Sequence, residues 1–334
     1  MSGILFITAT RIGDAILSTG LLGALIERHP GVPVTVACGA PAARIFAHTP
    51  GLERVIVLRK RRASAHWFDL WRLCAGNRWD VVVDLRRSLL RWCLLAKERH
   101  VLPLDRTPAH RVELLARTLK LDPAPAPRFW TGPEEEAEAA DLVPQGSPVI
   151  AVAPGANWRG KIWPGERFAA LCQRLTADDG PFPGARVMIT GGPDEQDSAQ
   201  PLFEALGGQA LDAMGRDLLV TSAALQRCAL FVGNDSGLMH LASAAGIPTF
   251  GLFGPTRDDL YGPWGEKGTV IRTPESVEQL IGHSGYDHRT TGSLMTSLTV
   301  DRVFEAIERR LPKCQRLPNP EAKFLQTGND PQEG

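Results

Sequence analysis

The sequence has few of the features that mark secreted, metal-binding or membrane-spanning proteins. Its 334 residues include six cysteines, which are scattered and never spaced as Cys-x-x-Cys. The scattered positions of the cysteines argue against a zinc site and a disulfide framework, and they favour a reducing compartment. No apolar run approaches the ~18 residues of a membrane-spanning helix, and the apolar start at residues 4–10 is too short for a secretory signal. We therefore expect a cytoplasmic protein without a transmembrane segment.

Two common nucleotide-binding motifs are also missing. No expected strand is followed by Gly-x-Gly-x-x-Gly, which disfavours a dinucleotide oxidoreductase, and the sequence has no P-loop. The net charge of zero hides an asymmetry, because residues 1–128 hold 20 Lys/Arg against 10 Asp/Glu and the remainder holds 17 against 27. A basic half suggests an acidic partner such as phosphorylated lipid, nucleic acid or an anionic sugar, with simple surface bias as the alternative.

What the sequence does contain is organised around residues 229–256. An apolar run at 229–232 predicts a buried strand, and a turn follows at 233–237. Apolar residues then recur at helical spacing until Gly246 and Pro248, before a second apolar run at 249–253. This order predicts a strand–turn–helix–strand unit of a parallel sheet, with the turn at the edge where open α/β sheets bind ligands.

The turn has the chemistry of an anion site. Asp235 or Ser236 can cap the helix, Gly237 leaves room for a group near the exposed N–H groups, and His240 lies one turn further on. The alternative is a capped helix without a ligand, with His240 as an ordinary helix histidine. Since a carboxylate repels phosphate, we expect Asp235 to orient N–H groups or to accept hydroxyls of a sugar or ribose.

The rest of the chain predicts two α/β domains. Strands are expected at residues 4–8, 32–38, 55–58, 79–84, 149–153, 186–190 and 269–271. Helices are expected at 16–26, 44–48, 110–119, 134–141 and 300–311, with a basic helix carrying Arg86, Arg87 and Arg91. Alternation without hairpin signals favours doubly wound parallel sheets. A Pro-rich linker at 121–128 predicts domains at 1–128 and 129–313, followed by a disordered tail at 314–334.

Several segments together resemble glycosyltransferase family 9, the heptosyltransferases that build the inner core of lipopolysaccharide. They are Arg11-Ile-Gly-Asp14, His110-Arg-Val-Glu113, 154–164, 233–240, Phe253-Gly-Pro-Thr256 and 294–303. The resemblance spans residues 4–311 and implies a GT-B architecture, two Rossmann-like domains facing a central cleft. It further implies inverting transfer, without a metal or cofactor, from ADP-L-glycero-β-D-manno-heptose to an anionic, lipid-linked core acceptor. No nucleic acid takes part, and peripheral contact with the cytoplasmic face of the inner membrane is allowed.

The resemblance also implies roles for individual residues. Asp14 matches the catalytic base, whereas by itself it would be interpreted as the cap of a helix beginning at Ala15. Lys161 matches the lysine that neutralises the donor pyrophosphate. The remaining donor-site candidates are Asn157, Glu195, Asp235, Ser236, Gly237 and His240.

The acceptor site is predicted from charge. Arg11, Arg59, Arg61 and Arg62 are its candidates, because guanidinium groups bind carboxylate and phosphate in bidentate fashion. A solvated charge run is the alternative for the cluster at 59–62. Two other functions stay open at this point: a different sugar-nucleotide enzyme of the same architecture, such as a UDP-N-acetylglucosamine 2-epimerase, and a non-catalytic module that binds nucleotide or glycan.

Overall fold

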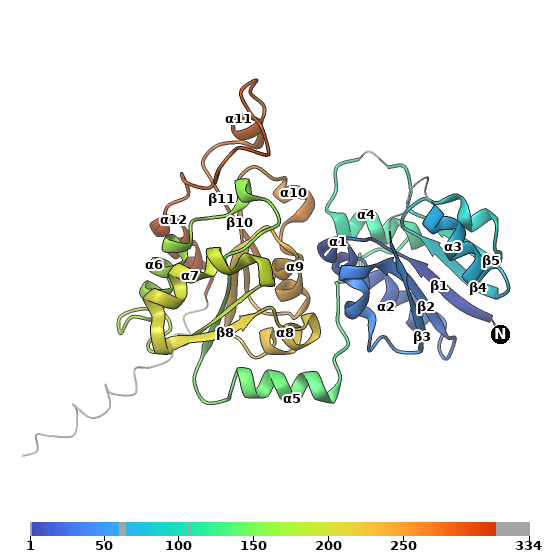
Figure 1. The fold of residues 1–334 in the computed structure, drawn as a ribbon, viewed down its shortest axis with the longest axis horizontal. Helices are drawn as coiled ribbons and strands as arrows, with labels where there is room; N and C mark the ends of the chain where they lie inside the picture. Colours follow the sequence, from blue (N-terminus) through green and yellow to red (C-terminus); the bar gives the residue numbers. More distant parts are fainter. Residues whose placement is uncertain (1, 60–64, 106, 312–334) are drawn as a thin grey trace, which may run out of the picture.

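The protein consists of two α/β lobes, each built on a parallel sheet (Figure 1). The computed structural model describes residues 2–59, 65–105 and 107–311. The first lobe contains a five-stranded sheet in the order β3-β2-β1-β4-β5, and the second contains a six-stranded sheet in the order β11-β10-β9-β6-β7-β8. All strand pairs are parallel. This confirms the predicted α/β class with two parallel sheets.

The first lobe alternates strands with helices and short 3-10 helices. Its strands are β1 (Ser2–Ile7), β2 (Val34–Gly39), β3 (Leu52–Leu58), β4 (Arg78–Asp84) and β5 (Leu95–Val101). Its helices are α1 (Ile12–Leu17), α2 (Thr19–Arg28), η1 (Ala40–Phe46), α3 (Ala65–Cys74), η3 (Leu89–Trp92), α4 (Arg111–Ala116) and η4 (Arg117–Leu119). The central strands are buried apolar runs, as both faces of the sheet are covered.

The second lobe has the same plan. Its strands are β6 (Val149–Ala153), β7 (Arg186–Gly191), β8 (Ala210–Met214), β9 (Leu230–Asn234), β10 (Thr249–Phe253) and β11 (Gly268–Arg272). Its larger helices are α6 (Gly165–Thr176), α7 (Gln196–Leu206), α8 (Leu218–Leu225), α9 (Gly237–Ala244) and α12 (Val300–Arg310). Short elements are η5 (Arg159–Lys161), η6 (Pro193–Glu195), η7 (Gly207–Gln209), α10 (Asp258–Tyr261) and α11 (Val277–Ile281).

Some local predictions differ from the structure. The expected helix at 16–26 is two helices that break at Ser18, whose hydroxyl donates to the carbonyl of Ala15. The expected basic helix around Arg86 is a turn followed by the four-residue η3. The expected helix at 44–48 is the 3-10 helix η1. The edge strands β5 and β8 were not predicted, because their exposed positions interrupt the apolar pattern.

The Pro-rich segment leads from the first lobe to the acidic helix α5 (Pro133–Leu142). It runs without helix or strand and packs on α2, where the Arg128 N–H donates to Thr19 Oγ1 (2.9 Å). The proposed domain boundary at 128/129 lies in this segment and stays a prediction. The predicted tail at 314–334 lies outside the described residues. Within the described part of the chain, no helix has the length and apolar character needed to cross a membrane.

Candidate active site

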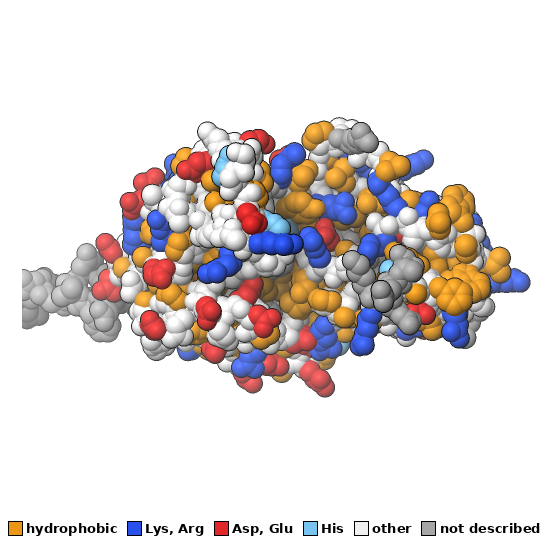
Figure 2. All heavy atoms as spheres, turned by 45° about the horizontal axis from the view of Figure 1, so that its top comes forward, with side chains coloured by type: hydrophobic (Ala, Val, Ile, Leu, Met, Phe, Trp, Pro, Cys, Tyr) orange, Lys and Arg blue, Asp and Glu red, His pale blue; other side chains and the backbone are white. Residues whose placement is uncertain are grey.

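The carboxyl ends of the strands of both sheets face one cleft between the lobes. A cavity of about 880 Å³ lies there, lined from the first lobe by residues 10–14 and from the second by residues that follow β6, β7, β8, β9 and β10. Helices α1 and α9 meet at the cleft, and a Cβ at Gly13 would lie 3.1 Å from Cδ2 of His240. Figure 2 shows the molecule hollowed between the lobes, with Lys and Arg side chains along the rim.

Lys161 and Asp235 form an ion pair on the second-lobe side of this cavity. Their Nζ and Oδ2 atoms are 3.3 Å apart, and the two side chains are only 13% and 11% exposed. The ammonium group therefore has a fixed position beside the turn that opens α9. The Lys161 ammonium group can bind an anionic ligand in the same cavity, and its ion pair with Asp235 restricts the rotamers of the lysine side chain.

The N-terminus of α9 opens into the same cavity, where Ser236, Gly237 and Leu238 line the wall. Within the described residues, the buried hydroxyls of Ser236 and Thr256 have no hydrogen-bond partner. A helix N-terminus with free N–H groups and nearby hydroxyls suits a phosphate or a sugar hydroxyl. Four of the predicted donor-site residues are thus together here: Asp235, Ser236, Gly237 and His240.

His240 is buried on the cleft-facing side of α9. Burial lowers its pKa from 6.5 to about 4; the negative charge of Asp235 opposes this change, and His110 and Lys161 add to it. The imidazole is consequently neutral at pH 7. Its Nδ1 is buried without a hydrogen-bond partner among the described residues, and the residue lines the cavity.

Glu195 and Asn157 line the cavity at its second-lobe end. The Gly192 N–H donates to Glu195 Oε2 (2.8 Å), which fixes the carboxylate after β7. Asn157 is exposed in the loop after β6. Both predicted donor-site residues therefore lie in the cavity.

Asn234, which was not predicted as a site residue, organises the loops around this part of the site. It is fully buried at the end of β9. Its Nδ2 donates to the Pro154 carbonyl (2.7 Å) and its Oδ1 accepts from the Trp163 N–H (3.0 Å). One side chain thus ties both ends of the loop that carries Lys161 to the strand beside it.

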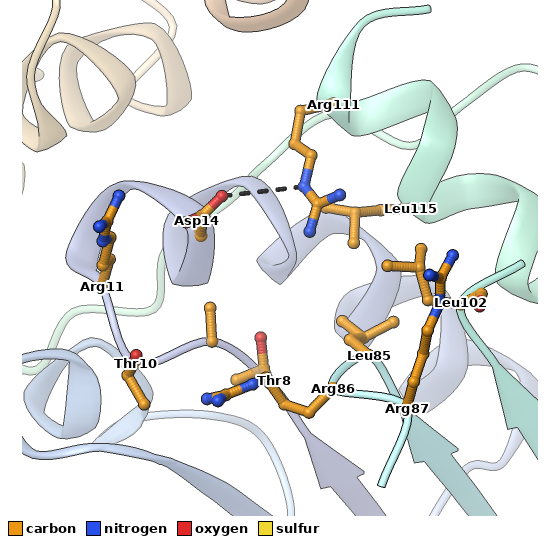
Figure 3. A pocket seen from close by; sticks show the side chains of 11 residues that line it. Thr8, Thr10, Arg11, Asp14, Leu85, Arg86, Arg87, Leu102, Arg111 and Leu115 are labelled. Carbon is orange, nitrogen blue, oxygen red and sulfur yellow. Dashed lines mark hydrogen bonds and ion pairs between the residues drawn. The ribbon is translucent and has the colours of Figure 1, made fainter. Parts of the chain in front are cut away.

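Asp14 lies where the larger cavity meets a second, smaller cavity. It is the third residue of α1, which begins at Ile12 with Arg11 at the N-cap position. The interpretation of Asp14 as the cap of a helix starting at Ala15 is therefore wrong. Its Oδ1 is 3.8 Å from Nε of Arg111, which projects from α4 toward it (Figure 3).

The smaller cavity, of about 400 Å³, lies within the first lobe and is rich in arginine. Arg11, Arg86, Arg87 and Arg111 line it together with Asp14, and Arg11 and Asp14 also line the larger cavity. Figure 3 shows that these side chains project into the cavity from the start of α1, from α4 and from the turn after β4. Four guanidinium groups around one carboxylate suit an anionic ligand that brings a hydroxyl to Asp14.

A buried carboxylate holds the turn that carries Arg86 and Arg87. Asp84 ends β4 fully buried, and it accepts from the Arg86 N–H (2.9 Å) and the Ser88 hydroxyl (2.7 Å). Burial raises the pKa of Asp84, against the lowering effect of the Ser88 hydrogen bond. Arg87 has a left-handed backbone (φ 54°), a conformation that costs a non-glycine residue about 1 kcal/mol. Such local strain is common at binding sites.

The other predicted acceptor residues have different places. Arg59 is exposed just after β3, and it is not among the described residues that line the two cavities. Arg61 and Arg62 lie outside the described residues. Arg86, Arg87 and Arg111 line the smaller cavity and were not predicted as site residues. Their position was a usable signal for Arg86 and Arg87, since they follow β4, which pairs in parallel with β1, and parallel strands place their carboxyl ends at the same sheet edge.

No metal site is evident in the described part of the chain, where no group of three or more His, Cys, Asp or Glu could hold an ion. The prediction of metal-independent chemistry stays a prediction.

Comparison with known proteins identifies relatives along most of the chain. The family model described as "Glycosyltransferase family 9 (heptosyltransferase)" matches residues 67–281. Lipooligosaccharide heptosyltransferase 2 of Haemophilus influenzae is 31% identical over 273 residues, which cover 79% of this chain and 73% of that protein.

Solved structures share the fold. The glycosyltransferase family 9 protein of Veillonella parvula has a TM-score of 0.77 at 23% identity, over 92% of this chain and 97% of that one. The Escherichia coli heptosyltransferase WaaC with ADP has a TM-score of 0.68 at 19% identity, over 92% and 99%. These similarities confirm the predicted GT-B-like architecture, and the family match does not favour the epimerase or the non-catalytic module. The chain belongs to glycosyltransferase family 9, the heptosyltransferase family, and is a glycosyltransferase.

Proposed function

We propose that the protein is an inverting heptosyltransferase with Asp14 as its general base. The donor is ADP-L-glycero-β-D-manno-heptose, and the acceptor is the anionic, lipid-linked inner core of lipopolysaccharide. The observation that carries this proposal is the position of Asp14, which lines both the arginine-rich cavity and the larger cleft cavity. A base at this junction can reach an acceptor hydroxyl on one side and a donor sugar on the other.

The two cavities suit the two substrates. In the larger one, Lys161 and the N-terminus of α9 supply positive charge for a pyrophosphate, and Glu195 supplies a carboxylate for ribose hydroxyls. In the smaller one, Arg86, Arg87 and Arg111 supply charge for acceptor phosphate or carboxylate groups. The solved relative that contains ADP supports an adenine nucleotide as the donor's leaving group.

The proposed reaction is a single displacement. The Asp14 carboxylate takes the proton of the acceptor hydroxyl while its oxygen attacks C1 of the heptose from the side opposite ADP. The bond from C1 to the pyrophosphate oxygen breaks, and its electron pair leaves with ADP. Lys161 and the α9 N–H groups stabilise the charge that develops on that oxygen. No metal is needed for this step, so chelation with EDTA is expected to leave turnover unchanged.

The test is turnover and donor binding of Asp14→Asn. Loss of a general base lowers kcat by about 10²–10⁴-fold, whereas the dissociation constant for ADP measured by calorimetry should stay within about threefold, since Asp14 is not a phosphate ligand. Asp301→Asn is a matched control, because Asp301 also lies in the first turn of a helix and pairs with an arginine, Arg174, on the second lobe. Equal turnover of Asp14→Asn and wild type contradicts the proposal.

A nucleotide comparison tests the donor class separately. Thermal unfolding is measured with ADP, UDP, GDP and NAD in parallel; a ligand at 100 times its dissociation constant stabilises the folded state by about 2.7 kcal/mol. Selective stabilisation by ADP supports the proposed donor. Selective stabilisation by UDP contradicts it and favours a different sugar nucleotide.

A further inference from the structure

His110 joins the two lobes at the start of α4. Its Nε2 atom lies 2.9 Å from the carbonyl oxygen of Gly262, which follows α10 in the second lobe. Its ring lies against the ring of Trp264, with 4.7 Å between the centroids and 33° between the planes. One side chain of the first lobe therefore makes both a polar and an aromatic contact with the second lobe.

The other ring nitrogen of His110 holds the first turn of α4. Nδ1 accepts from the Val112 N–H (3.2 Å), and the Glu113 carboxylate accepts in return from the His110 N–H (3.1 Å), which completes a capping box. Because Nδ1 accepts, the proton of the neutral ring lies on Nε2, which donates to the Gly262 carbonyl. Burial lowers the pKa of His110, against the raising effect of this last hydrogen bond, so the ring is neutral at pH 7.

The second-lobe partners of His110 are themselves held in place. The Gly262 N–H donates to the Asp258 carbonyl (2.7 Å), and a Cβ at position 262 would lie 2.9 Å from the same oxygen. The hydroxyl of Ser243, on α9, donates to the Trp264 carbonyl (2.7 Å). His110 therefore contacts a closely packed segment that is tied to the helix at the larger cavity.

The sequence neighbours of this contact lie in the candidate active site on both sides of the cleft. Arg111 directly follows His110, lines the smaller cavity and projects toward Asp14 (Figure 3). Tyr261 directly precedes Gly262 and lines the larger cavity. The contact between the lobes is thus one residue away from the wall of each cavity.

We propose that His110 is a positioning residue for the transfer reaction, because its bond to Gly262 sets the place of the second lobe relative to Arg111 and Asp14. His110 is not among the described residues that line the two cavities, so it acts through the arrangement of the lobes. A displacement of about 1 Å between reacting groups can lower a rate about 10²-fold. The inference rests on the proposed function, in which the donor binds in the larger cavity and the acceptor beside Asp14.

Two substitutions separate the two hydrogen bonds of the ring. In His110→Asn the side-chain carbonyl can still cap α4, since asparagine is a favoured N-cap residue, but the shorter side chain has no atom at the place of Nε2. In His110→Gln the amide nitrogen can take the place of Nε2 and donate to Gly262, whereas glutamine is not a favoured N-cap residue. The matched control is His100→Asn, since His100 is a first-lobe histidine that bonds to Glu98 on its own strand (3.2 Å).

Hydrogen–deuterium exchange of the full chain, without donor or acceptor, tests the contact itself. In His110→Asn the backbone amides of residues 258–264 in the second lobe should exchange about three- to tenfold faster than in wild type, as expected for the loss of one hydrogen bond. The same amides should keep their wild-type protection in His110→Gln and in His100→Asn. Unchanged protection in His110→Asn overturns the proposal.

The turnover assay tests the effect on the reaction, with thermal unfolding as the check that each variant folds. His110→Asn should lower kcat about three- to tenfold, because a smaller share of the molecules has the reactive arrangement of the lobes. Its dissociation constant for ADP should stay that of wild type, and His110→Gln should recover most of the lost kcat. If His110→Gln is as slow as His110→Asn, the histidine acts only as the cap of α4 and the proposal is overturned. Since the exchange measurement needs neither substrate, its outcome is separate from the test of the proposed function.

Discussion

Protonation of His240 should make the protein unstable in mild acid. The histidine is buried against α1, and burial lowers its pKa to about 4, compared with 6.5 for an unburied histidine. Between these two pH values the unfolded chain binds a proton that the folded protein does not. The free energy of unfolding therefore rises with pH across this range. The stabilisation that comes from the neutral histidine is lost as pH falls from 6.5 toward 4.

The magnitude follows from the two pKa values. A pKa of about 4 in the folded protein against 6.5 in the unfolded chain corresponds to about 3 kcal/mol once protonation is complete, and to about 2 kcal/mol at pH 5. Asp235 already favours the charged imidazole, so this is the loss that remains after its effect. His110 is buried as well, and burial lowers its pKa in the same direction.

The assay isolates His240 by difference. Free energies of unfolding are measured in urea at pH 5 to 8 for wild type and for His240→Gln, whose amide has similar length and does not titrate. Relative to the variant, wild type should lose about 2 kcal/mol between pH 8 and pH 5. His110 is present in both proteins, so the difference between them reports His240 together with its coupling to His110.

The control variant is His283→Gln, which removes an exposed histidine of the second lobe. It should keep the pH dependence of the free energy of unfolding of wild type. If the curves of wild type and His240→Gln run parallel from pH 8 to pH 5, His240 is hydrated or paired in the folded protein, and the argument from burial is wrong.

Three further predictions concern groups that hold the site together. Asp84→Ala should raise the acceptor KM about tenfold by releasing the turn that carries Arg86, with Asp84→Asn restoring most of the loss; an equal effect on the ADP dissociation constant contradicts this positioning role. Lys161→Met should weaken ADP binding by at least about tenfold and reduce its salt dependence, measured by calorimetry; unchanged affinity contradicts a pyrophosphate contact. Asn234→Ala should lower the free energy of unfolding by about 3 kcal/mol, since the Trp163 N–H and a carbonyl lose their partner in a buried site; a loss under about 1 kcal/mol in urea unfolding contradicts this.

Local sequence was enough to predict the two parallel sheets and several residues that line the larger cavity. The apolar runs of the central strands are buried on both faces, so they stand out without knowledge of their neighbours. The turn at 233–237 contains residue types that favour the start of a helix. The helix α9 does begin there, with Ser236 at its N-cap position and Gly237 as its first residue. Edge strands β5 and β8 have exposed faces and mixed composition, and the sequence pattern alone did not reveal them.

The composition of the arginine-rich cavity was decided by tertiary structure. A run of four adjacent basic residues at 59–62 is the strongest local charge signal, yet Arg59 is not among the cavity-lining residues described. Arg86 and Arg111 are 25 positions apart and carry no shared local pattern. They come near Asp14 because β4 pairs with β1, which brings the turn with Arg86 to the same sheet edge, and because Arg111 projects from α4 toward Asp14.

The protonation state of His240 likewise depends on the tertiary structure. Its sequence neighbours place it on a helix, which would leave an ordinary histidine with an ordinary pKa. The ring is buried in the folded protein, where Gly13 of α1, a segment more than 200 residues earlier, approaches it closely, and this burial makes the charged form unfavourable. Side-chain periodicity and turn chemistry are local properties, whereas desolvation and the convergence of charges depend on segments that are distant in the sequence and meet only in the folded protein.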